Sequence, residues 1–186
     1  AAYPLINEER LSRGFDVSFI GTWTPGREAL LLPLQEAGLN LGVFGDKNWE
    51  RGLLSPSYGG PVNYLSEVNT VYNSSQINLD LLHEATLIED YISFRIYDCM
   101  ASGSFLLAYQ RPGHEDLWRP GAELAGSYEP ARLLEAVQHY LSRKEERELI
   151  AQRGYECMLA EHSWQQRLKG ILLPGLEMRL LKAAAA

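Results

Sequence analysis

The chain has 186 residues, of which 46% are hydrophobic and 22% are charged, as expected for one ordinary globular domain. The net charge of −7 and the pI near 5.1 argue against non-specific nucleic-acid binding, which depends on Lys and Arg side chains meeting phosphates. The sequence has no apolar run of about 20 residues, so we expect no integral membrane segment. Two cysteines without zinc-ligand spacing are typical of reduced, packed thiols, and we expect a cytoplasmic protein.

Strand-like and helix-like stretches alternate along the first half of the chain, and the last third is helical. β-branched and aromatic runs predict the strands, and apolar residues at helical spacing predict the helices. The expected strands are 16–23, 39–46, 75–82, 105–109 and 122–128, and the expected helices are 27–38, 63–73, 93–102, 130–142, 144–162 and 163–173.

The helix expected at 63–73 has a clear apolar face, and the helix expected at 144–162 has a charged one. In the helix at 63–73 this face contains Leu65, Val68, Val71 and Tyr72. The first turns of the helix at 144–162 are rich in charge, and we expect its charged residues on a solvated face.

Alternating strands and helices predict an α/β fold in which a Rossmann-like parallel sheet carries helices on both faces. We expect one domain over residues 1–186, with a core at about 16–172 and a C-terminal helix and tail at 173–186. Ligands of such sheets bind outside the carboxyl ends of the strands. The segments that follow the strands are therefore the candidate functional segments.

The segment after the first strand, "GTWTPGR", contains Gly21, Thr22 and Arg27. A helix start offers unpaired backbone N–H groups and the positive end of a dipole, and an arginine adds a forked cation, so a phosphate group would fit here. The motif is neither G-x-G-x-x-G nor a P-loop. The alternative is an ordinary turn with an exposed arginine.

The stretch "DYISFRIYDCMASG" contains Asp90 and Asp98 with seven residues between them. Asp90 lies in the loop after the third expected strand, and Asp98 lies on the second turn of the helix that begins near Ser93. Both carboxylates would then face the ligand crevice and could accept hydrogen bonds from sugar hydroxyls, while Arg95 holds a diphosphate. The alternative is a surface ion pair between Arg95 and Asp98.

The histidines predict no metal site. His83 and His114 lack metal-ligand spacing with acidic residues, and His162 is expected to cap or orient a helix start.

Four motifs in order resemble one protein family. "DVSFIGTWTPGR", "RIYDCMASG", "HYLSRKEERELIAQRG" and "EHSWQQR" are similar to the C-terminal domain of GT-B glycosyltransferases of group 1, family-4 type. That family has two glutamates separated by seven residues, followed by a turn of small residues. The closer resemblance is to the spore-maturation-protein-like (CgeB-like) members, and it covers about 16–172.

The resemblance implies a role for each matching residue. Asp98 would accept the ribose hydroxyls of a nucleotide, and Asp90 would face the donor sugar. Asp90 and Arg95 would be the catalytic residues, and Arg95 would stabilise the leaving diphosphate. The residues that would complete the donor site are Gly21, Thr22 and Arg27 in the first loop, Tyr58, Gly60 and Val62 in the segment "YGGPV", and Tyr91, Ile92 and Ser93 before the helix.

The chain departs from the family pattern at three positions. Aspartates stand at 90 and 98 in place of glutamates, and Thr22 stands where many relatives carry a basic residue. The phosphate charge would therefore fall to Arg27 and Arg95.

The resemblance implies a glycosyltransferase that transfers a sugar from a nucleotide-diphosphate donor, with a UDP type favoured, to an acceptor hydroxyl without a metal or another cofactor. The expected partner is the N-terminal GT-B domain of the same protein, and this half alone would be inactive. A non-catalytic nucleotide-binding or scaffolding module is the alternative. A dinucleotide-dependent oxidoreductase is disfavoured because G-x-G-x-x-G does not follow the first strand.

Overall fold

The computed structural model describes residues 14–81, 92–109 and 130–176. Within these ranges four parallel strands form one sheet in the order β2-β1-β3-β4. Because every pairing is parallel, each of the three connections between the strands is a crossover, as the Rossmann-like α/β class requires. The expected strand at 122–128 lies outside the described residues. The strands are β1 (Phe15–Ile20), β2 (Leu41–Phe44), β3 (Ser75–Asp80) and β4 (Leu106–Ala108).

Helices follow each described strand or lead into the next one. Among the described residues, no helix combines the length and the apolar character needed to cross a membrane. The α-helices are α1 (Pro25–Glu36), α2 (Val68–Ser74), α3 (Phe94–Ala101), α5 (Leu133–Leu141), α6 (Lys144–Cys157) and α7 (Trp164–Arg167); the 3₁₀ helices are η1 (Lys47–Arg51), η2 (Ser55–Ser57) and η4 (Pro130–Arg132), and π-helical turns span Met158–His162 and Leu168–Leu172.

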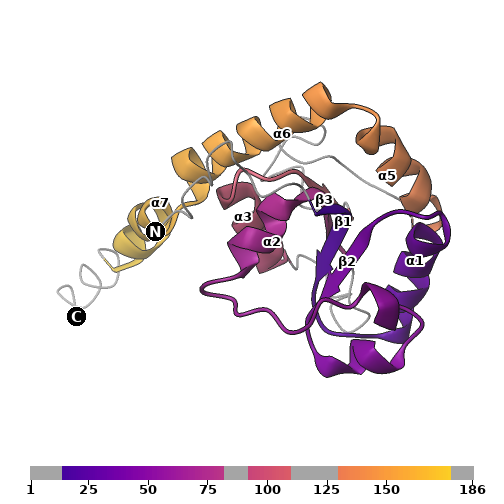
Figure 1. Cartoon of the computed structure of the whole chain (residues 1–186). Coiled ribbons are helices and arrows are strands. Elements are labelled where there is room, and N and C mark those ends of the chain that lie inside the picture. The colour runs from indigo at the N-terminus through magenta and orange to yellow at the C-terminus, as the bar shows by residue number, and fades with distance from the viewer. Residues whose placement is uncertain (1–13, 82–91, 110–129, 177–186) are drawn as a thin grey trace.

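The sheet is covered on both faces (Figure 1). Alternate residues of β1 point to opposite sides, as the pleat of a strand requires: Val17 and Phe19 join a core with α1 and α5, whereas Ile20 joins a second core with α2 and α3. Helix α6 runs from α5 towards α3 and bridges the two cores, with Ile150 in the first and Cys157 against the second.

The helix expected at 63–73 is shorter than its apolar pattern predicts. Helix α2 begins at Val68, and the side chain of Leu65 is 91% exposed. The Asn63 side chain accepts a hydrogen bond from the Leu65 backbone N–H, and the Asn63 backbone N–H donates one to the Glu67 carboxylate. These local bonds satisfy the backbone in a turn conformation and so delay the helix.

The charged start of α6 is not wholly solvated. Arg147 is only 2% exposed, because its guanidinium donates to the carbonyls of Tyr140 and Leu141 and to the side chain of Gln76. These bonds satisfy the last carbonyls of α5 and tie α5 and α6 to the start of β3. The expectation of a solvated face is therefore wrong for this arginine.

Two of the motifs that carry the family resemblance meet in space. Tyr97 on α3 accepts a hydrogen bond from Arg167 at 2.5 Å, and the Arg167 guanidinium lies 4.5 Å from the Tyr97 ring centroid. The ring of His162 lies 5.8 Å from the same ring and is buried. Ser163, not His162, caps α7, through its side chain. The contacts of Tyr97 with Arg167 and His162 hold α3 against the segment that follows α6.

Candidate functional site

The carboxyl edge of the sheet brings together the loops that the sequence singles out. The loop after β1 leads directly into α1, and the loop after β2 leads into η1. The segments after β3 and β4, at 82–91 and 110–129, lie outside the described residues. Helix α3 begins immediately after the first of them, so its N-terminus belongs to the same edge.

The loop between β1 and α1 is organised around a buried arginine. Thr24 caps α1 by accepting from the Arg27 N–H. The Arg27 guanidinium donates to the carbonyl and hydroxyl oxygens of Thr22, at 2.9 and 2.8 Å, and to the carbonyl of Leu81 at 3.4 Å. Arg27 is 6% exposed, so the alternative of an exposed turn arginine is wrong. Arg27 joins the end of β1 to the end of β3.

The loop after β2 packs tightly against the loop after β1. The Gly21 N–H donates to the Phe44 carbonyl at 2.9 Å, and a Cβ on Gly45 would lie 2.0 Å from the Gly21 carbonyl oxygen. The Tyr58 hydroxyl donates to the Gly45 carbonyl, and the Gly45 N–H donates to the Gly60 carbonyl. The loop at Gly21, the loop at Gly45 and the segment from Tyr58 to Gly60 are thus packed against one another.

Helix α3 begins with a cap and an arginine that points back to the sheet. Ser93 caps the helix by accepting from the Arg95 N–H. The Arg95 guanidinium donates to the Ile20 carbonyl through Nε at 2.9 Å and Nη2 at 2.6 Å, and its Nη1 pairs with Asp80. Burial alone would lower the pKa of Arg95, but the Asp80 carboxylate raises it above its ordinary value.

These contacts exclude one of the two interpretations of Arg95, the surface ion pair with Asp98. The partner is Asp80 at the buried end of β3, so the surface pair of Arg95 with Asp98 is wrong. Arg95 and Arg27 both lie over the ring of Phe19, with their guanidinium carbons 5.0 and 5.2 Å from its centroid. Both guanidiniums are bonded to protein oxygens, and their roles in binding phosphate stay predictions.

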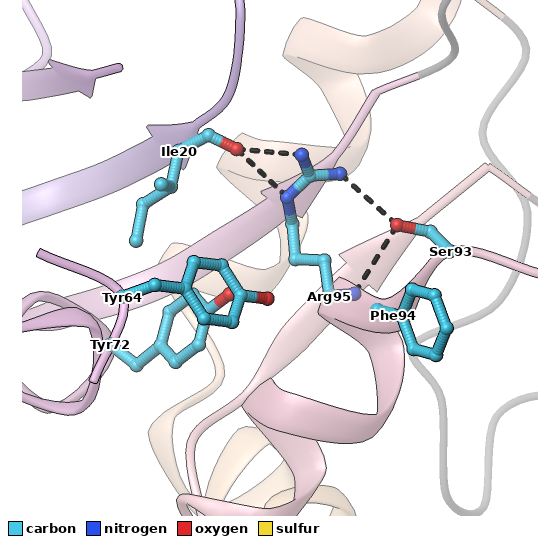
Figure 2. Close-up of a pocket in the computed structure, with 6 residues that line it drawn as sticks. All are labelled: Ile20, Tyr64, Tyr72, Ser93, Phe94 and Arg95. Atoms are coloured by element: carbon cyan, nitrogen blue, oxygen red, sulfur yellow. Dashed lines mark hydrogen bonds between the residues drawn. The ribbon is translucent and has the colours of Figure 1, made fainter. Parts of the chain in front are cut away.

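A pocket opens beside the start of α3 (Figure 2). The Arg95 guanidinium lies between the Ile20 carbonyl and the Ser93 hydroxyl. In this view the rings of Tyr64 and Tyr72 stand on one side of Arg95 and the ring of Phe94 on the other. The pocket has a volume of about 190 Å³, and it is lined by Ile20, Tyr64, Tyr72, Ser93, Phe94 and Arg95.

Asp98 lies one turn further along α3 than Arg95, and its carboxylate accepts a hydrogen bond from the Tyr64 hydroxyl. Burial raises the pKa of the Asp98 carboxyl above its ordinary value, although the Tyr64 hydrogen bond and the charge of Arg95 act in the opposite direction. A half-buried carboxylate with one phenolic partner can accept hydrogen bonds from a hydroxylated ligand.

The structure gathers most of the residues that the sequence singles out. Gly21, Thr22 and Arg27 share one loop, and Tyr58 and Gly60 pack against it from beside β2. Ser93, Arg95 and Asp98 lie along one helix. Val62 and Ile92 pack against the second core, so their contribution to a donor site stays a prediction. Asp90 and Tyr91 lie outside the described residues.

Sequence reasoning missed Asp80 and Tyr64. Asp80 ends an apolar strand, and a charged residue at the carboxyl end of a buried strand is itself a signal of a partner at that edge. Tyr64 precedes α2 in a segment that was expected to be helical, and no sequence spacing links it to Asp98.

One group of described residues could hold a metal ion. Ligand atoms of Cys157, Glu161 and His162 lie within 4.8 Å of one another. The Arg167 guanidinium lies 3.5 Å from His162 Nδ1, and its positive charge opposes a cation there. The group is at the end of α6, not at the carboxyl edge of the sheet. That the donor site works without a metal or another cofactor stays a prediction.

Comparison with known proteins identifies the family. Residues 27–172 match the family model described as glycosyl transferase-like, and the chain belongs to this family. A search of curated proteins found no match. None of these findings bears on the finer spore-maturation-protein-like resemblance, which stays a prediction.

Solved structures share the fold at low identity. Sucrose-phosphate synthase from Thermosynechococcus elongatus superimposes with a TM-score of 0.68 and 17% identity, over 95% of this chain and 48% of that one. HepE from Anabaena in complex with UDP-glucose gives 0.58 and 13%, over 78% and 44%. The C-terminal domain of a group 1 glycosyl transferase from Francisella tularensis gives 0.58 and 13%, over 86% and 95%.

The described fold is therefore one half of a GT-B glycosyltransferase fold. The chain spans about half the length of the first two of these structures and nearly all of the C-terminal domain from Francisella tularensis.

Proposed function

We propose that this chain is the donor-binding half of a glycosyltransferase and that it binds a UDP-type sugar at the carboxyl edge of its sheet. The observation that carries the proposal is the placement of Asp98 one turn beyond the capped start of α3, beside the end of β1. Anabaena HepE, which shares the fold, was solved with UDP-glucose.

The diphosphate would bind where two helix starts meet the sheet edge. The N-termini of α1 and α3 present the positive ends of their helix dipoles to this edge. Arg27 and Arg95 lie beneath and add positive charge, although Asp80 neutralises part of it. Such fixed dipoles can stabilise a leaving diphosphate without a metal ion.

The ribose would bind along α3. From Ser93 to Asp98 the helix rises about 7.5 Å, which is of the order that separates the ribose from the diphosphate of a nucleotide. Asp98 would accept the ribose hydroxyls, and Asp90 would face the donor sugar. The segment from Tyr58 to Val62 would lie near the base. The acceptor and the remaining catalytic groups would come from the preceding half of the protein.

The test is calorimetric titration of the 186-residue chain with UDP and with GDP. We expect saturable UDP binding that Asp98→Asn weakens by about 1.5–3 kcal/mol, the usual worth of a hydrogen bond to a charged group. Glu135→Gln, an exposed carboxylate on α5, is the matched control and should bind as the wild type does. A folded wild-type chain that binds neither nucleotide would refute the proposal.

A further inference from the structure

Tyr64 is hydrogen-bonded to Asp98, the carboxylate that the proposed function assigns to the ribose. Its hydroxyl donates to Oδ2 of Asp98, across 34 positions of sequence. Among the described residues, this hydroxyl is the one hydrogen-bond partner of that carboxylate. A phenol that donates to a carboxylate offers the same chemistry as a sugar hydroxyl that donates to it. The Tyr64 hydroxyl therefore takes the position at Asp98 that the proposed function gives to one ribose hydroxyl.

The segment that carries Tyr64 is built to move more easily than the helix that carries Asp98. Tyr64 is 48% exposed and Leu65 is 91% exposed, and the side chains from Asn63 to Glu67 make few apolar contacts in either core. Asp98, by contrast, lies on a helix that Arg95 ties to the sheet and that Tyr97 ties to Arg167. Exposed segments with little buried apolar surface open at low cost.

Tyr64 also stands in the wall of the pocket beside Arg95. In Figure 2 its ring overlaps the ring of Tyr72 on one side of Arg95. The same side chain thus both donates to the Asp98 carboxylate and lines the pocket beside Arg95.

On these grounds, and resting on the proposed function, we infer that Tyr64 is a specificity-determining residue that competes with the ribose for Asp98 and must release the carboxylate before a nucleotide binds fully. A ribose has two neighbouring hydroxyls and can engage both carboxylate oxygens, so it displaces Tyr64. A 2′-deoxyribose has one hydroxyl and can use Oδ1 while Tyr64 keeps Oδ2. Tyr64 therefore penalises ribose more than deoxyribose.

The test compares UDP with 2′-deoxy-UDP on Tyr64→Phe and the wild type. If the Tyr64 bond is present in about nine molecules out of ten, its removal raises the affinity for UDP up to about tenfold. We expect a gain of about three- to tenfold for UDP and a smaller gain for 2′-deoxy-UDP. Removing an exposed hydroxyl leaves the apolar ring, so folding is not at risk. Tyr155→Phe on α6 is the matched control and should bind both ligands unchanged.

A double-mutant cycle completes the test, because the Tyr64→Phe gain should disappear in an Asp98→Asn background. An unchanged or weaker UDP affinity in Tyr64→Phe, with Asp98→Asn still harmful, would overturn the role of Tyr64 and leave the proposed function standing. An equal gain for both ligands would overturn the competition for the second carboxylate oxygen. Absence of UDP binding in every variant, or a wild-type affinity in Asp98→Asn, would overturn both.

Discussion

Asp98 shows at the scale of one residue how a binding site can cost stability. Burial raises the pKa of its carboxyl above the ordinary value of 3.8, so the folded protein holds the proton more tightly than the unfolded chain does. The contribution of Asp98 to stability is therefore full below the unfolded pKa and is lost as the pH rises through the folded pKa. At neutral pH the ionised carboxylate works against folding, which is the pattern of a residue kept for binding.

Asp98→Asn removes this charge and keeps an oxygen that can accept from Tyr64. We expect the free energy of unfolding at pH 7 to rise by about 0.5–1 kcal/mol, within the usual range of stabilising substitutions at functional sites. The gain should shrink as the pH falls from 7 toward 4, because the wild-type carboxyl then becomes protonated. Urea denaturation at several pH values measures both effects.

The Glu135→Gln chain should show no comparable gain, since its carboxylate is 66% exposed. A loss of stability in Asp98→Asn at neutral pH would contradict the expectation and would mean that the ionised carboxylate supports the fold.

At the scale of elements, the loops after β1 and β2 form one interlocked unit. The Trp49 ring nitrogen donates to the Gly21 carbonyl at 2.9 Å, and the Trp23 backbone N–H donates to Asp46 at 2.7 Å. Gly45 has a φ of +144° and presses against Gly21, so both its conformation and its lack of a Cβ are needed. The shape of the proposed phosphate loop therefore depends on a glycine from a different loop.

Substitution of this glycine tests the interlock. Gly45→Ala should lower the free energy of unfolding by about 3 kcal/mol or more, because it adds a backbone clash to an unfavourable φ. It should also weaken UDP binding by displacing the loop at Gly21. Urea denaturation and calorimetry on the same preparations measure the two losses.

Gly38→Ala is the matched control for the backbone conformation alone. Gly38 has a φ of +78°, but a Cβ there would have nothing within 4 Å. We expect a loss of about 1–2 kcal/mol and unchanged UDP binding. Equal losses of stability in the two variants would show that the contact between Gly45 and Gly21 contributes nothing.

At the scale of the whole molecule, the described chain would supply one side of the proposed donor site. Two residues that line the pocket beside Arg95 are exposed to solvent, Tyr64 to 48% and Phe94 to 70%. Solved structures of the same fold, such as sucrose-phosphate synthase, are about twice as long as this chain. An open site leaves the reacting bond in water, where fixed dipoles stabilise a leaving group least.

We therefore expect the 186-residue chain to bind UDP-glucose without transferring or hydrolysing the sugar. The rate of UDP release is monitored by chromatography with UDP-glucose in excess. We expect this rate to equal the rate measured without protein. A calorimetric titration with UDP-glucose shows in parallel that the site is occupied. Release of UDP that Asp98→Asn abolishes would contradict this expectation and show that the half contains a complete active site.

The sequence by itself determined the order of elements and, through the parallel sheet, the edge at which we propose the site. β-branched runs predicted β1 to β4 because strand and helix periodicities are local properties of the chain. The bounds of α3 were predicted to within one residue, since Ser93 caps its start and Ser102 its end. The longer helix expected before Val68 was wrong, because a turn centred on Asn63 competes locally with the helical backbone.

Only the tertiary structure decided which groups the charged and polar side chains meet. Arg95 lies three residues from Asp98 but pairs with Asp80, because folding brings the end of β3 and the carbonyl of Ile20 to its guanidinium. The bond from Tyr64 to Asp98 likewise joins two elements that approach only when α2 and α3 pack on the same face of the sheet. Hydrogen-bond partners depend on distance in space, and the spacing of two residues along the chain does not give that distance.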